Sequence, residues 1–178
     1  MNKIIYIKNI FFLSAFFSVF LIFFLSCASS PKNTGNSEQK IIAGEVSWDY
    51  WKSNAGWAVY DAYDYEPEQA EIDKLKKLLR EMDYSFTIFA TTFCDECMEN
   101  LPRLFKVFES SQIPPERYHL FGLDDKLSEP SGEFKKYNIS STPVVFVKVD
   151  NIIIGEAAYP YLWLKNFIEI FQKFEENR

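Results

Sequence analysis

The spacing of apolar and polar positions changes several times along the chain, and each change marks an expected element. Residues 68–82 carry apolar side chains at helical intervals after Pro67, which predicts a helix. Residues 85–90 form a short apolar run of the kind found in buried central strands. The further expected elements are a helix at 94–108, a strand at 118–123, a short helix ending near Tyr137, strands at 144–149 and 152–154, and a helix around 164–171.

This alternation predicts an α/β fold over residues 68–178, with a mixed central sheet flanked by helices. The pair Asp150-Asn151 suits a tight turn, so the last two strands are expected to form a hairpin. Residues 46–67 precede this domain and are dense in tryptophan and tyrosine. We expect this N-terminal extension to pack on an edge or a face of the domain.

The first segment of the chain has the pattern of an export signal. Two lysines precede an almost wholly apolar run over residues 10–25, which falls short of the roughly 20 residues of a membrane span. Cys27 follows the run after a serine, and this arrangement resembles the lipobox of bacterial lipoproteins, from which Phe24 departs. The resemblance implies a signal peptide at 1–26 and a lipidated Cys27 that opens a flexible polar tether at 27–45. An uncleaved anchor and ordinary signal cleavage are the alternatives.

Charge and cysteine usage narrow the functions that the chain can have. Its net charge of −6 comes with no cluster of basic residues, which argues against nucleic acid as a partner because phosphates need a basic surface. With Cys27 assigned to lipid, the three cysteines leave the single pair Cys94 and Cys97. Export would place this pair where disulfides persist.

The sequence Cys94-Asp95-Glu96-Cys97 follows a predicted buried strand and opens a predicted helix. Free backbone amides and the helix dipole stabilise a thiolate at such a position, and the thiolate is the reactive form of cysteine. The two-residue spacing lets the second thiol resolve a mixed disulfide made by the first. A static disulfide is the structural alternative. The only histidine, His119, lies in a strand expected at the sheet edge, and no metal and no cofactor are expected because zinc needs four ligands.

Three features in register resemble the thioredoxin superfamily over residues 68–173. The first is the strand, Phe93, the cysteine pair and the helix that follows. The second is Pro102, eight residues beyond the first cysteine, where the active-site helix of the family is kinked. The third is Ser141-Thr142-Pro143 ahead of the strand at 144–149, which is similar to the cis-proline loop of the family.

This resemblance implies the thioredoxin fold and assigns roles to particular residues. Cys94 would be the nucleophile and Cys97 the resolving thiol, while Phe93, Thr142 and Pro143 would bind the substrate. The backbone before the cis-proline pairs with a substrate peptide in the manner of a strand.

Two departures from the family pattern affect the expected chemistry. Ile88 stands where thioredoxins carry a buried aspartate that helps deprotonate the resolving thiol. Glu99 or water would then have to take that proton, or the transfer would be slower. Asp95 and Glu96 replace the usual Gly-Pro between the cysteines. We expect their charge to oppose the Cys94 thiolate and to dominate there, which would make the couple reducing.

The expected function is that of a thiol–disulfide oxidoreductase in the cell envelope of a bacterium, lipid-anchored to a membrane and facing the periplasm or the exterior. It would reduce disulfides of exported proteins and be reduced again by an upstream thiol reductant. One alternative is a non-catalytic, membrane-tethered binding module of thioredoxin fold that docks partners through its aromatic extension. The other is a metal chaperone.

Overall fold

The computed structural model describes residues 40–57, 64–158 and 160–178. The expected signal peptide, Cys27 and the first part of the tether lie outside the described residues. Over the described ranges, no helix is both long enough and apolar enough to cross a membrane.

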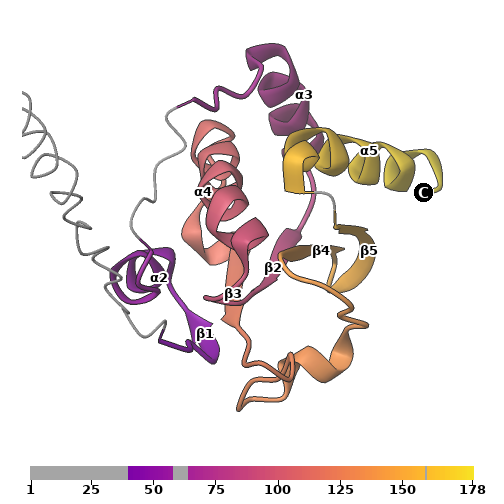
Figure 1. The fold of residues 1–178 in the computed structure, drawn as a ribbon. Coiled ribbons are helices and arrows are strands. Elements are labelled where there is room, and N and C mark those ends of the chain that lie inside the picture. Colours follow the sequence, from indigo (N-terminus) through magenta and orange to yellow (C-terminus); the bar gives the residue numbers. More distant parts are fainter. Residues whose placement is uncertain (1–39, 58–63, 159) are drawn as a thin grey trace, which may run out of the picture. The chain divides into compact units, whose positions relative to one another are not determined.

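One mixed sheet organises the described part of the chain, and its five strands lie in the order β1-β3-β2-β4-β5 (Figure 1). β2 runs parallel to β3 and antiparallel to β4, while β1 and β5 pair antiparallel at the two edges. The expected mixed α/β architecture is confirmed at this level. The strands are β1 Gly44–Val46, β2 Tyr84–Ala90, β3 Tyr118–Gly122, β4 Val144–Val149 and β5 Ile152–Ala157.

Helices occupy the connections that the apolar spacing predicted. The predicted helix at 94–108 is α4, and Cys94 is its N-cap rather than its first residue. Asp150 and Asn151, at the turn between β4 and β5, both have positive φ, as a tight hairpin of this kind requires. The helices are α2 Trp48–Asn54, α3 Gln69–Leu79, α4 Asp95–Ser110 and α5 Trp163–Glu176, with 3-10 turns η2 Pro115–Arg117, η3 Glu133–Lys136 and η4 Pro160–Leu162.

The N-terminal segment holds two elements that were not predicted from its residues. β1 begins at Gly44, inside the segment expected as tether, and its three residues are too few to show an alternating pattern. The helix α2 follows at once, and the Ser47 hydroxyl caps it by accepting from the Tyr50 amide at 3.1 Å. Because β1 pairs with β3 on the side away from β2, β3 is not an edge strand, and the expectation that His119 lies in an edge strand is wrong. Its Nδ1 lies 2.6 Å from Oε1 of Glu45 on β1.

The central strand β2 is buried on both faces, and this burial fixes the place where the chain leaves the sheet. Phe86 and Ile88 point into a large core that includes side chains of α2, α3, α4 and α5. Phe89 points into a smaller core on the opposite face, where its ring lies 4.9 Å from that of Tyr137. A strand anchored on both sides gives its C-terminal end a fixed position, and the cysteine pair begins four residues beyond that end.

The described part of the aromatic extension packs on the domain, in line with its expected role. Trp48 stacks on Phe105 of α4 with a ring distance of 4.2 Å. Trp51 has no exposed surface, and its ring meets that of Trp57 edge-on at 5.6 Å. The extension is therefore continuous with the main core.

Candidate active site

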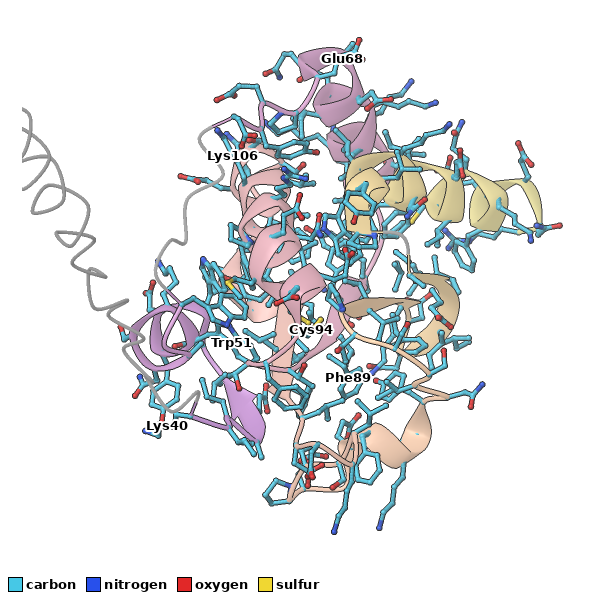
Figure 2. All side chains as sticks on the ribbon, in the orientation of Figure 1. Lys40, Trp51, Glu68, Phe89, Cys94 and Lys106 are labelled. Carbon is cyan, nitrogen blue, oxygen red and sulfur yellow. The ribbon has the colours of Figure 1, made fainter. Side chains whose placement is uncertain are left out.

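Cys94 occupies the N-cap of α4, immediately after the turn that leaves β2. Its backbone is extended, with φ −96° and ψ 119°, and its Sγ accepts the Cys97 amide at 3.1 Å. An N-cap side chain normally supplies an oxygen to one of the free amides of the first turn. Here a sulfur takes that role, so the helix N-terminus points its donors at the sulfur of Cys94. Figure 2 shows Cys94 at the end of α4.

The two cysteines are free thiols with opposite preferences for their proton. Cys94 is half-buried, and its pKa is lowered from 9.0 to about 6, chiefly because the Cys97 thiol donates a hydrogen bond to the Cys94 sulfur. Burial of Cys94 raises the pKa, and the hydrogen bond from the Cys97 amide lowers it further. Cys97 has no exposed surface, and burial raises the pKa of its thiol far above the ordinary value. Near neutral pH the site therefore holds a thiolate at Cys94 and a thiol at Cys97.

The expectation that Asp95 and Glu96 would dominate at Cys94 is wrong. The groups that set the Cys94 pKa are the neighbouring hydrogen-bond donors and burial, and the only part of Glu96 among them is its backbone amide, which lowers the pKa. Both carboxylates are exposed to solvent, which screens their charge. The Glu96 carboxylate accepts hydrogen bonds from Tyr161 and Asn100. Donors in direct contact with the sulfur outweigh these screened charges.

The loop before β4 lies against the reactive sulfur. The Thr142–Pro143 peptide bond is cis, as the resemblance implied, and Sγ of Cys94 lies 3.2 Å from the carbonyl oxygen of Thr142. The hydroxyls of Thr91 and Thr142 are 3.4 Å apart, so this loop and the turn after β2 are in contact. Pro143 is buried at the start of β4. The structure thus brings Cys94, Cys97 and Thr142 together.

Phe93 and Pro102, which the resemblance also singled out, lie before and after the cysteine pair in the chain. Phe93 directly precedes Cys94, and 42% of its surface is exposed. Pro102 lies buried within α4. Phe93 is thus an apolar side chain in solvent next to the reactive sulfur.

The proton route expected through Glu99 is not formed in the structure. Glu99 is exposed and its Oε1 lies 3.2 Å from Nη1 of Arg103. Ile88 is fully buried in the core. The groups that set the pKa of Cys97, besides burial, are Cys94, Thr91 and Thr142, none of which is a carboxylate.

Several residues around the site were not singled out from the sequence. Nε1 of Trp57 donates to the Thr92 carbonyl at 2.7 Å, and Nε1 of Trp163 donates to the Asn100 carbonyl at 3.1 Å. Both tryptophans come from segments far away in the sequence. Apart from their aromatic character, which predicts only burial, no pattern in the sequence connects them with the cysteines.

Metal-binding groups do not gather near the site. Over the ranges that the structure describes, no three or more His, Cys, Asp or Glu side chains lie close enough to hold a metal ion together.

Comparisons with known proteins give little further information about the fold family or the function. No family model matches the chain, and no curated protein matches it. Among solved structures, it is similar to a protein of unknown function from Pseudomonas aeruginosa, with 14% identity, a TM-score of 0.42, and 73% of this chain and 80% of that chain covered. It is also similar to an HIV epitope-scaffold, with 14% identity, a TM-score of 0.33, and 74% of this chain and 99% of that chain covered. At these scores, neither likeness bears on the fold family or the function.

Proposed function

We propose that the protein is a thiol–disulfide oxidoreductase of thioredoxin fold, in which Cys94 is the nucleophile and Cys97 the resolving thiol. The observation that carries the proposal is the asymmetry of the pair. One sulfur is held as a thiolate at a helix N-terminus, and the other is a buried thiol that donates to it. A structural disulfide or an inert thiol does not need this arrangement, whereas nucleophilic exchange does.

The proposed reaction has two exchange steps. The Cys94 thiolate attacks one sulfur of a substrate disulfide, forms a mixed disulfide, and releases the other substrate sulfur as a thiolate. Cys97 then gives up its proton to solvent and attacks Sγ of Cys94, which releases the remaining substrate sulfur. The substrate disulfide is reduced by two electrons, and the protein is left with a Cys94–Cys97 disulfide. A dithiol donor restores the reduced pair by the same steps in reverse.

The substrate would dock on the loop before β4. The Thr142 carbonyl lies beside the Cys94 sulfur, so an extended peptide that pairs with the backbone there would bring its disulfide to the nucleophile. Phe93 offers an exposed apolar side chain next to Cys94. Pro143, which is buried at the start of β4, would fix this loop and complete the substrate-binding group with Phe93 and Thr142.

Reduction of disulfides in exported proteins is the direction we propose. The sequence predicted a reducing couple from a destabilised Cys94 thiolate, whereas the lowered pKa of Cys94 stabilises the reduced form and moves the couple toward oxidation. The reducing direction is proposed instead because the Cys94 thiolate is ready to attack a substrate disulfide at neutral pH, while Cys97 keeps its proton until the mixed disulfide has formed. Equilibration with glutathione measures the potential, and a value near the strongly oxidising end, about −120 mV, would reverse the direction.

Attachment of the protein to a membrane through a lipid on Cys27 is also part of the proposal. Its support is the pattern of the first 27 residues. Incorporation of a labelled fatty acid into the full chain in bacteria, and its loss in Cys27→Ser, would test it.

The activity itself is tested by reduction of insulin with dithiothreitol as the donor. We expect catalysis by the wild type and none by Cys94→Ser. Reduced Cys97→Ser, mixed with insulin after the free dithiothreitol has been removed, should accumulate a mixed disulfide. Cys27→Ser serves as the matched control, because it removes a cysteine outside the proposed site and should retain full activity. A wild type no faster than Cys94→Ser would reject the proposal and favour the non-catalytic binding module.

A further inference from the structure

An exposed tyrosine is fixed beside the active-site helix. Tyr161 lies in η4 with 57% of its surface exposed, and its hydroxyl lies 2.9 and 2.8 Å from the two carboxylate oxygens of Glu96. The Asn100 amide donates to Oε2 of the same carboxylate at 3.2 Å. An aromatic ring in solvent ordinarily loses conformational freedom when it binds a partner. Here the hydroxyl already holds the ring in one place.

The charge around this ring is negative. Within the described part of the chain, Glu96 has hydrogen-bond donors but no ion-pair partner, and neither has Asp95. The nearby Glu99 forms an ion pair with Arg103, and these two residues with Glu96 are the charged groups that act on Tyr161. Among the described residues, the cation that acts on Tyr161 is Arg103, which is engaged with Glu99, so the negative charge of Glu96 is not neutralised.

We propose that Tyr161 and Glu96 form a subsite for a lysine or arginine side chain of the substrate, next to the substrate cysteine that Cys94 attacks. A cation is attracted both to the face of an aromatic ring and to a carboxylate. A carboxylate can accept about four hydrogen bonds, so Tyr161 and Asn100 leave Glu96 with capacity for another donor. This inference rests on the proposed function and adds a substrate class to it.

The position of Tyr161 and Glu96 limits which substrate residue they can contact. Glu96 is two residues beyond Cys94 in the first turn of α4, about 3 Å further along the helix axis and about 200° around it. Only a long side chain from within one or two residues of the attacked cysteine can reach across the end of the helix to this carboxylate. The substrate class is thus a disulfide with lysine or arginine beside one of its cysteines.

Peptide mixed disulfides test the subsite directly. Each peptide carries one cysteine joined to a nitrobenzoate thiol, and the peptides differ only in an adjacent Arg, Gln or Glu. The Cys94 thiolate attacks the peptide sulfur, a protein–peptide disulfide forms, and the coloured nitrobenzoate thiolate leaves. Reaction of the same peptides with free glutathione gives the intrinsic reactivity by which each rate is divided.

After this correction, we expect the reduced wild type to react about five- to tenfold faster with the Arg peptide than with the Gln peptide. This ratio should fall to near 1 in Glu96→Gln and in Tyr161→Ala, and it should decrease as salt is added. Asp95→Asn is the matched control, since it removes one negative charge from the residue next to Cys94 in the sequence and should leave the ratio unchanged.

Three results would overturn the subsite. One is a corrected ratio near 1 in the wild type, and another is a ratio that survives Glu96→Gln. The third is an equal loss in Asp95→Asn, which would show a general field rather than a site. The proposed function has a different signature of failure, because then Cys94→Ser would react with every peptide as fast as the wild type.

Discussion

The sharpest quantitative consequence of the site concerns the donor that Cys97 provides to Cys94. The Cys97 thiol is the largest cause of the lowered Cys94 pKa, ahead of the amide of the same residue. Cys97→Ala removes the thiol and keeps the amide, which lies 3.1 Å from Sγ of Cys94. The substitution therefore separates the contribution of the side chain from that of the helix N-terminus.

A hydrogen bond to a charged group contributes about 1.5–3 kcal/mol, and a thiol is a weak donor, so we take the lower end of that range. Since one pKa unit corresponds to about 1.4 kcal/mol, the Cys94 pKa should rise by about 1 in Cys97→Ala. At pH 7 the thiolate fraction would fall from about 90% to about half, given the wild-type pKa of about 6. Cys97→Ser retains a hydroxyl donor and should keep the pKa close to that of the wild type.

The measurement is the pH dependence of alkylation of Cys94 by iodoacetamide, followed by mass spectrometry of the peptide that contains this residue. The midpoint of the profile is the quantity to compare, because a thiolate of lower pKa is also a weaker nucleophile and absolute rates partly cancel. A wild-type midpoint at the ordinary value of about 8.5 would refute the described geometry of the pair. An unchanged midpoint in Cys97→Ala would show that the backbone amides alone stabilise the thiolate.

Three further outcomes follow from the same structure. The mixed disulfide at Cys94 should resolve faster as the pH rises from about 7 to about 9, because burial keeps the proton on Cys97. Acid quenching and mass spectrometry measure the lifetime of the mixed disulfide, and a pH-independent lifetime would contradict this. The free energy of unfolding of the reduced protein, compared with that of Cys94→Ala, should be level below pH 6 and rise up to about pH 8.5. The reason is that the pKa of Cys94 is lower in the folded than in the unfolded protein. Urea titrations at several pH values test this, and the opposite slope would contradict it. Gly122→Ala should lower the free energy of unfolding by about 1–3 kcal/mol, because the added Cβ would clash with the backbone carbonyl oxygen of Ile42. An unchanged urea midpoint would show that β1 is not held as described.

Local sequence patterns predicted the scaffold of the site well. The apolar run of β2 and the helical spacing of α4 placed Cys94 at a helix start, and there it is the N-cap. The motif before β4 predicted a cis-proline at Pro143, and the bond is cis. These features depend on residues close together in the chain, so their spacing carries the information.

The electrostatics of the site could not be predicted in the same way. Asp95 and Glu96 stand between the cysteines in the sequence, but the pKa of Cys94 depends on which atoms touch its sulfur. The sequence does not show that the Glu96 carboxylate meets Tyr161, which is 65 residues away. The short strand β1 escaped prediction for a related reason, because its pairing with β3 is visible only in three dimensions.

The hydrogen bond from Trp57 to the Thr92 carbonyl affects where a functional fragment of this protein should begin. A fragment starting at residue 68, where the sequence suggests that the domain begins, would keep both cysteines and β2 to β5. It would lose β1, α2 and Trp57, and it would leave a buried carbonyl without its donor two residues before the nucleophile, at a cost of about 1–3 kcal/mol. A fragment that includes the buried Ile42 keeps these supports, so expression and crystallisation should start at or before that residue.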